Sequence, residues 1–116
     1  MLEDKAKELG FTPLAAIKSW SYVGVDPTDQ LLIGPAIAMP QALKRAGLTM
    51  ADMDLIDIHE AFAAQVLSVT QKLADTGWCG AQGCEDDCSV DESKLNVLGG
   101  SIALGHPFAA TGARMV

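Results

Sequence analysis

Residues 96–114, NVLGGSIALGHPFAATGAR, contain four glycines and a His-Pro pair, and this density of helix- and strand-breaking residues constrains the fold more than any other feature. Glycine lets a backbone approach a bulky ligand closely, and proline favours the start of a helix. We therefore expect a ligand-facing loop, with Pro107 starting a helix behind His106. Three glycines are the expected positions of close approach: Gly99, Gly100 and Gly105.

The same stretch also resembles a phosphate-binding loop in its spacing, because Gly100 and Gly105 form a Gly-x4-Gly pattern. Such a loop requires a lysine followed by a serine or threonine, and His106 and Pro107 stand in those places. Nucleotide hydrolysis is therefore not expected.

The composition of the 116 residues indicates one small globular domain with a modest core. Apolar residues make up 49% of the chain, which argues against disorder. The net charge of -7 repels nucleic acid and anionic membrane surfaces, so neither is an expected partner. The longest apolar stretch, residues 31–39, is broken by Gly34 and Pro35, and the charged N-terminus has no signal region. We expect a soluble, non-secreted chain without a transmembrane segment.

Helical and strand-like patterns alternate along the chain, which predicts an α/β fold with a parallel or mixed sheet. The expected helices cover residues 2–9, 40–46, 60–77 and 107–116, and the expected strands cover 13–25, 54–59 and 94–99. Thr49 and Asp52 resemble a capping box. No strand follows the final helix, and we interpret the chain as a piece of something longer.

Three cysteines lie within ten residues of the expected loop 78–92, beside three acidic side chains: Cys79, Cys84, Cys88, Glu85, Asp86 and Asp87. Their odd number fits a reducing compartment better than a disulfide framework. We interpret them as incidental thiols in an exposed, solvated loop. Because no Cys-x2-Cys pair is present, a structural zinc site is only the weaker alternative.

The two histidines, His59 and His106, both fall between an expected strand and the helix after it. Ligand sites in open α/β sheets form beyond the carboxyl ends of strands, so we expect the two rings to converge. Converging imidazoles can act as a base and as a hydrogen-bond donor on one reacting atom. A helix N-terminus behind each ring would favour its neutral form. The alternative for each histidine alone is a helix cap or a surface residue.

Two residues after His59 have competing interpretations. Glu60 is a possible general base, or a carboxylate that favours the first turn of the expected helix. Phe62 begins an apolar stripe with Val66, Val69 and Leu73, which is more typical of core packing than of a binding face.

Two motifs, HEAFAAQ at 59–65 and NVLGGSIALGHPFAATGAR at 96–114, resemble the thiolase family. The His-Glu-Ala-Phe form is similar to the 3-ketoacyl-CoA thiolase branch that forms the β-subunit of fatty-acid β-oxidation trifunctional complexes. AMPQALKRAGLT, at 38–49, is similar to the helix before the first motif. The resemblance covers nearly the whole chain except residues 78–90. It implies a thiolase-like α/β fold in which residues 1–116 are part of the C-terminal domain, without its final strands or the N-terminal domain.

The resemblance implies the reaction of an acetyl-CoA C-acyltransferase, which reversibly cleaves a 3-ketoacyl-CoA with coenzyme A through an acyl-cysteine. Coenzyme A is then a co-substrate, and neither a further cofactor nor a metal is implied. The implied partners of the intact protein are acyl-CoA, a second thiolase subunit in a homodimer, and a trifunctional α-subunit. The implied location is the bacterial cytoplasm or the mitochondrion.

The resemblance also assigns roles within the site. His106 would activate the nucleophilic cysteine and donate to the thioester oxyanion, His59 would supply a second donor directly or through a water, and Glu60 would orient the pair. The substrate would be lined by Phe62, Gly105 and Phe108.

Two family features have no counterpart in these residues, namely a Cys-x-Ser nucleophile and a Cys-x-Gly motif after the Gly-His-Pro helix. None of the three cysteines can be assigned either role. We therefore expect the chain to be inactive on its own. The alternative function is a stand-alone acidic module that binds acyl-CoA or a protein without catalysis.

Overall fold

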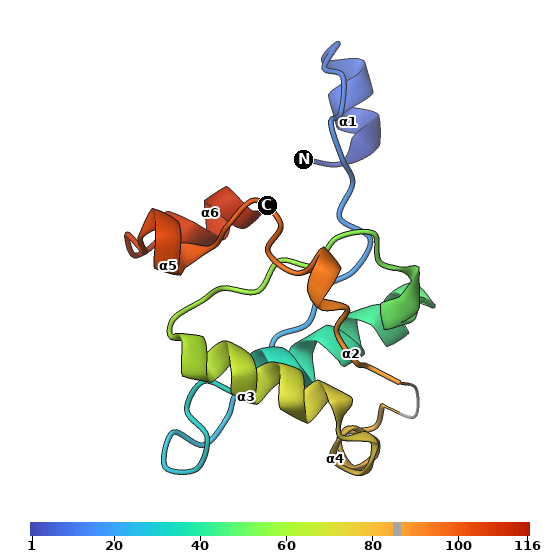
Figure 1. The fold of residues 1–116 in the computed structure, drawn as a ribbon. Coiled ribbons are helices and arrows are strands. Elements are labelled where there is room, and N and C mark those ends of the chain that lie inside the picture. Colours follow the sequence, from blue (N-terminus) through green and yellow to red (C-terminus); the bar gives the residue numbers. More distant parts are fainter. Residues whose placement is uncertain (85–86) are drawn as a thin grey trace.

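The computed structural model describes residues 1–84 and 87–116, and its regular elements are mainly helices (Figure 1). The α-helices are α1 Glu3–Glu8, α2 Gly34–Ala46, α3 Ala63–Ala74, α4 Thr76–Ala81, α5 Ser101–Leu104 and α6 Thr111–Met115; the 3-10 turns are η1 Met50–Asp52 and η2 Glu92–Lys94. Within the described residues, the only β pairing is one parallel bridge between Ile56 and Leu95.

The expected mixed sheet is therefore not formed by the described residues, and this part of the prediction is not confirmed. The segments 54–59 and 94–99 do lie side by side and parallel, but through a single bridge. Residues 13–25 are coil beside α2, where the Ser19 hydroxyl donates to the Ala42 carbonyl over 2.7 Å. A strand needs a neighbour for its backbone N–H and C=O groups, and no ladder partner lies along these segments within the described chain.

The helix bounds differ from the sequence expectation at four places. α2 begins at Gly34, six residues early, because Pro35 occupies its first turn, and Pro40 lies inside the helix. α3 begins at Ala63 instead of residue 60 and ends at Ala74. Gly77 does not cap it, because Asp75 ends α3 and starts α4. The final helix does not begin at Pro107 but at Thr111.

Other local signals are confirmed. The N-terminal helix forms at Glu3–Glu8, within the expected range. Gly47 ends α2 in the left-handed conformation, at φ 68°. Thr49 and Asp52 form the expected capping box around η1, with the backbone N–H and the hydroxyl of Thr49 both donating to the Asp52 carboxylate at 2.8 Å.

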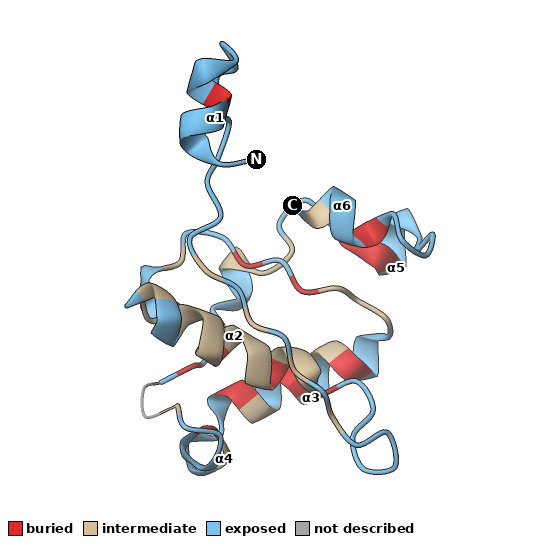
Figure 2. Cartoon of the chain, turned by 180° about the vertical axis from the view of Figure 1, so that it is seen from behind, coloured by how far each residue is buried: buried red, intermediate tan, exposed pale blue. Residues whose placement is uncertain are grey.

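The core lies between α2 and α3, and Figure 2 shows the buried positions of α3 along the side that faces α2. It consists of one cluster of buried apolar side chains: Ile33, Ala36, Met50, Ile56, Ile58, Val69, Leu73, Cys79 and Cys88. Val69 and Leu73 supply the predicted apolar stripe of α3. Phe62 does not belong to it, because its side chain is 65% exposed and it precedes the first turn of α3.

The described chain is more open than a compact domain of its length. Its radius of gyration is 15.5 Å, against about 13 Å expected for a compact chain of this size. α1 and the segment after it project away from the α2–α3 body (Figure 1). Large apolar side chains such as Leu14, Trp20 and Tyr22 are exposed. No helix in the described residues has the length and apolar character needed to cross a membrane.

We expect this exposed apolar surface to make the purified chain self-associate. Sedimentation velocity over a concentration series should show species larger than a monomer, and thermal unfolding should be broad. A monomer with a sharp unfolding transition at all concentrations would contradict this expectation.

Candidate active site

The rings of His59 and His106 meet at one point of the structure. Their centroids lie 4.1 Å apart and their planes are tilted by 46°. His59 follows the segment that carries the Ile56–Leu95 bridge, and His106 follows α5. The predicted convergence of the two imidazoles is therefore confirmed.

A buried hydroxyl holds each ring at its Nδ1 atom. The Oγ of Ser101 lies 2.9 Å from Nδ1 of His59, and the Oγ1 of Thr111 lies 2.6 Å from Nδ1 of His106. Ser101 opens α5 and Thr111 opens α6, and each is 5% exposed. A ring held at Nδ1 presents its other nitrogen, Nε2, on the opposite edge. Neither hydroxyl residue was predicted from the sequence, although each flanks the Gly-His-Pro motif.

The Thr111 contact replaces the expected role of Pro107, which starts no helix. Neither histidine lies in the first turn of a helix, so the expected effect of a helix dipole on the rings does not apply. Their orientation comes instead from direct hydrogen bonds to hydroxyl groups.

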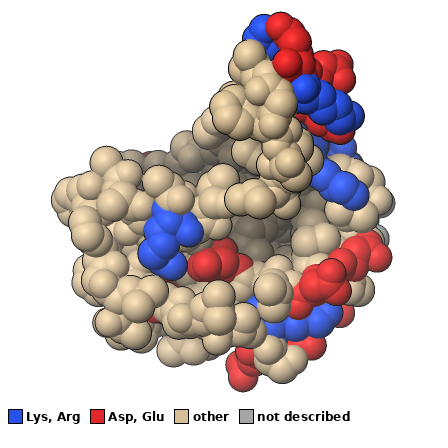
Figure 3. Space-filling model, turned by 90° about the horizontal axis from the view of Figure 1, so that it is seen from above, with Lys and Arg blue, Asp and Glu red and all other residues tan. Residues whose placement is uncertain are grey.

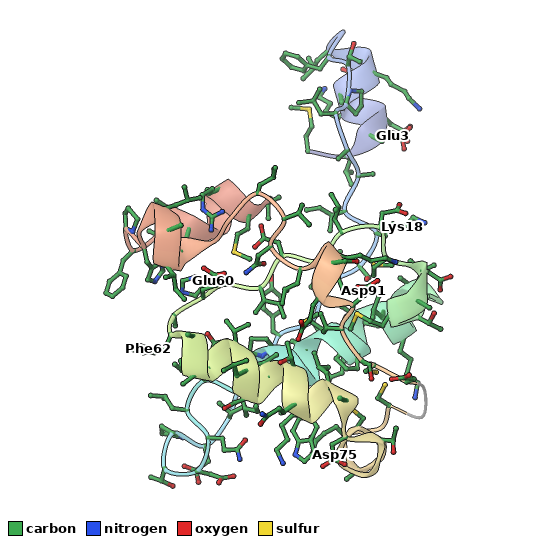
Figure 4. All side chains as sticks on the ribbon, in the orientation of Figure 1. Glu3, Lys18, Glu60, Phe62, Asp75 and Asp91 are labelled. Carbon is green, nitrogen blue, oxygen red and sulfur yellow. The ribbon has the colours of Figure 1, made fainter. Side chains whose placement is uncertain are left out.

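Glu60 sits next to this pair and links two segments. Its carboxylate accepts a hydrogen bond from Nδ2 of Asn96 at 2.8 Å and one from the backbone N–H of Ile102 at 3.0 Å. Figure 4 shows Glu60 between the bridged segments and the α5–α6 lobe. Because α3 begins only at Ala63, Glu60 does not belong to its first turn, as one interpretation expected.

The side chain of Asn96 continues the pairing of the two segments beyond the single β bridge, by binding the backbone of Ile58. Its side-chain amide donates to the Ile58 carbonyl at 3.0 Å and accepts from the Ile58 N–H at 2.8 Å. Its φ of 47° is left-handed, a conformation that asparagine adopts more readily than most residues. Asn96 was not predicted from the sequence to belong to the site, although it begins the second motif.

Gly100 leaves room for the Glu60 carboxylate. A Cβ atom at Gly100 would lie 2.2 Å from Cδ of Glu60. Gly99 and Gly105 have φ values of 83° and 88°, which glycine adopts without strain. Backbone conformation thus accounts for these two glycines, and packing against Glu60 accounts for Gly100.

The surroundings of His59 and Glu60 lower the pKa of both side chains. Burial lowers the pKa of His59 below its ordinary 6.5, the nearby His106 and Arg114 lower it further, and Glu60 partly opposes them. The hydrogen bonds from Ile102 and Asn96 lower the pKa of Glu60. At neutral pH the site therefore contains a neutral His59 beside an ionised Glu60.

The proposed substrate-lining aromatic residues lie in different places. The Phe108 ring lies 5.0 Å from the His106 ring, centroid to centroid, and Phe108 is 87% exposed. Phe62 lies at the start of α3, apart from the α5–α6 lobe (Figure 4). Figure 3 shows the molecule from above. This face is mostly uncharged and is hollowed, and a basic and an acidic patch lie next to each other on it.

The described residues contain no group of three or more His, Cys, Asp or Glu side chains able to hold a metal ion. The described cysteines and Asp87 thus give no support to the zinc alternative. Glu85 and Asp86, part of the predicted acidic loop surface, lie outside the described residues.

We expect Arg114→Gln to raise the pKa of His59 toward 6.5, because it removes a neighbouring positive charge. The measurement is an NMR titration of the imidazole Cε1–H signals, with Lys5→Gln in α1 as the control. Since the folded-state pKa lies below 6.5, the neutral ring stabilises the fold above pH 6.5. This contribution is lost as the pH falls from 6.5 through the folded pKa. A His59 pKa at or above 6.5 in the unchanged chain would contradict the expectation.

Comparison with known proteins matches the chain to one family. The family described as "Thiolase, C-terminal domain" matches residues 11–116. The 3-ketoacyl-CoA thiolase of Klebsiella pneumoniae (strain 342) is 54% identical over 118 residues, covering all of this chain and 27% of the relative. The 3-ketoacyl-CoA thiolase of Escherichia fergusonii is 53% identical over 123 residues, again covering 27% of the relative. The chain thus spans about a quarter of the length of these relatives.

Solved structures give the same family. Human mitochondrial 3-ketoacyl-CoA thiolase is 42% identical with a TM-score of 0.78, covering 97% of this chain and 25% of the human chain. Acetyl-CoA acetyltransferase from Syntrophomonas wolfei is 41% identical with a TM-score of 0.81. The match covers 99% of this chain and 26% of the Syntrophomonas wolfei chain. The human enzyme has also been solved in complex with CoA.

Proposed function

The chain belongs to the thiolase family, as part of its C-terminal domain, and we propose that it supplies the histidine half of a 3-ketoacyl-CoA thiolase active site. The single observation that carries this proposal is the 4.1 Å approach of the His59 and His106 rings. In the proposed reaction, a cysteine from outside these residues attacks the keto carbon, and coenzyme A later removes the acyl group from it.

Each hydroxyl contact is compatible with either tautomer of its ring, and the proposal assigns opposite tautomers to the two rings. When Nδ1–H of His106 donates to Thr111, its Nε2 carries the lone pair that takes the proton of the cysteine thiol. When Nδ1 of His59 accepts from the Ser101 hydroxyl, its Nε2–H can donate to the thioester oxyanion. The lowered pKa of His59 supports this role, because a neutral ring whose Nδ1 accepts a hydrogen bond carries its one proton on Nε2.

Glu60 acts in this proposal as a positioning residue rather than as a base. Both of its oxygens already accept hydrogen bonds, from Asn96 and from Ile102, and its lowered pKa opposes proton uptake. By tying Ile102 to the segment after His59, it fixes the neighbouring Ser101 and hence the His59 ring. We propose that Phe108, Gly105 and Phe62 line the acyl or pantetheine path; the contact of Phe108 with His106 supports the first of these.

The proposal extends to the intact protein. Acyl-CoA and coenzyme A would be its substrates, and the solved human complex with CoA supports the second. We propose a thiolase-type homodimer, with a trifunctional α-subunit as a further partner, and no cofactor besides the co-substrate. The relatives are enzymes of bacteria and of human mitochondria, which supports the bacterial cytoplasm or the mitochondrion as the location.

The test uses a chimaeric thiolase, in which this chain replaces the matched quarter of the Klebsiella pneumoniae enzyme. We expect the chimaeric thiolase to cleave acetoacetyl-CoA with CoA within about tenfold of the parent rate, because it combines the missing cysteines with the histidine pair. The chain alone should show no thiolysis. A folded but inactive chimaera would contradict the proposal, as would thiolysis by the chain alone.

The non-catalytic alternative is separated by a calorimetric titration of the chain with CoA. The proposed function predicts little binding, because the chain supplies only part of the site. Tight binding of CoA by a chain whose chimaera is inactive would establish the binding module instead.

A further inference from the structure

Three cysteine side chains meet where α4 ends and the segment toward η2 begins. Cys79 and Cys88 are 1% and 3% exposed and belong to the core, whereas Cys84 is half-buried. The sulfur atoms of Cys84 and Cys88 lie 2.6 Å apart. The quoted thiolase motifs lie outside this loop, although the family match includes it.

Cys79 has a side-chain hydrogen bond with Cys88 and is also held by two backbone carbonyl groups. Its thiol donates to the carbonyl groups of Lys72 and Leu73, at 3.3 and 3.5 Å, in the last turn of α3. These contacts hold Cys79 against α3, while Cys84 and Cys88 face each other across four positions of the chain.

We propose that Cys84 and Cys88 form a reversible redox pair, which closes to an intramolecular disulfide on oxidation by a peroxide and leaves Cys79 as a thiol. A bonded disulfide has sulfur atoms about 2 Å apart, so the observed approach requires only a small further movement. This proposal is independent of the roles of the histidines.

Cys84 is the residue that meets the oxidant. A cavity of about 140 Å³ is lined by residues that include Cys84, Cys88, Lys44 and Thr49. The Lys44 ammonium donates to the Gly83 carbonyl at 3.2 Å, at the residue before Cys84. Burial raises the pKa of Cys88 and of Cys79, which keeps both as poorly reactive thiols at neutral pH.

The reaction balances in two steps. The Cys84 sulfur gives up its thiol proton and attacks one oxygen of hydrogen peroxide. The O–O bond breaks, the sulfur becomes a sulfenic acid, and the departing hydroxide takes up the thiol proton and leaves as water. Cys88 sulfur then attacks the sulfenic sulfur, the S–S bond forms, and the hydroxyl group leaves as a second water with the thiol proton. The two sulfurs supply the two electrons that reduce one peroxide to two waters.

The test treats the reduced full chain with one equivalent of hydrogen peroxide, alkylates the remaining thiols and maps the disulfide by mass spectrometry. Cleavage at Glu85, Asp86 and Asp87 separates Cys84 from Cys88. We expect one linked pair of peptides with Cys79 alkylated, a loss of about 2 Da before alkylation, and full reversal by dithiothreitol. The same treatment in urea should give a mixture of pairings. The same mixture in native buffer would overturn the proposal.

Variants keep the test decisive. Cys79→Ala should leave the Cys84–Cys88 link unchanged, whereas Cys88→Ala should stop at a sulfenic acid on Cys84 that dimedone traps. Equally fast closure between Cys79 and Cys84 in Cys88→Ala would overturn the proposal. So would one equivalent of tightly held zinc in the purified reduced chain that protects all three thiols from alkylation.

Discussion

Replacing His106 by alanine should lower kcat/KM for acetoacetyl-CoA thiolysis by at least about 10³-fold in the chimaeric thiolase. The substitution removes a base held 2.6 Å from Thr111, and with it a donor to the oxyanion. General-base catalysis contributes roughly 10²- to 10⁴-fold and one oxyanion donor roughly 10²- to 10³-fold, and the two losses need not add. The measurement is steady-state kinetics on the parent chimaera and on the variant.

Thr111→Val is the informative companion, because it keeps the shape of the side chain and removes its hydroxyl contact with Nδ1. We expect a loss of roughly tenfold and a change in the pH profile, since the ring stays but its tautomer is no longer fixed. Lys7→Ala, in the projecting α1, serves as the control and should leave the rate unchanged. A folded His106→Ala chimaera with more than a tenth of the parent activity would remove His106 from the proposed chemistry.

The sequence was sufficient for features that depend on neighbouring residues. The capping box of Thr49 and Asp52 and the helix stop at Gly47 are local patterns, and both are present in the structure. The meeting of His59 and His106 was also predicted: His59 comes soon after one of the two segments joined by the Ile56–Leu95 bridge, and His106 comes after the other, with α5 between them. The order of expected strands and helices was enough to predict that two rings far apart in the sequence meet in the structure.

The predictions failed where structure depends on contacts that the sequence pattern does not reveal. The apolar pattern of residues 13–25 predicted a strand, but a strand forms only where another edge can pair with it. Pro107 was expected to aim His106, because proline commonly starts helices, whereas the hydroxyl of Thr111 holds the ring. A proline rule cannot reveal such a contact, since it depends on the turn between the two residues.

The same limit applies to Gly100. From the sequence, a ligand was the natural reason for a glycine beside the histidine motif. The structure gives a partner from the other motif, the carboxylate of Glu60, which occupies the space that a side chain would need. The two motifs are thus fitted to each other.

Gly100→Ala should therefore lower both the thermal midpoint and the activity of the chimaeric thiolase. A Cβ atom 2.2 Å from Cδ of Glu60 forces the carboxylate away and breaks its hydrogen bonds to Asn96 and Ile102. Hydrogen bonds to a charged group contribute about 1.5–3 kcal/mol each, so we expect a loss of about 2 kcal/mol after partial rehydration. Because Ile102 adjoins Ser101, the displacement should also loosen the His59 ring and reduce kcat.

A double-mutant cycle separates this cause from a general effect of alanine. In a Glu60→Ala background the clash is gone, and the backbone of Gly100, at φ -131°, is one that alanine adopts readily. There Gly100→Ala should be neutral or slightly stabilising, because alanine reduces the entropy of the unfolded chain. Gly24→Ala, with no atom within 4 Å of the added Cβ, is the matched control and should change little in either background. If Gly100→Ala is equally damaging with and without the Glu60 carboxylate, the two motifs are not coupled through this contact.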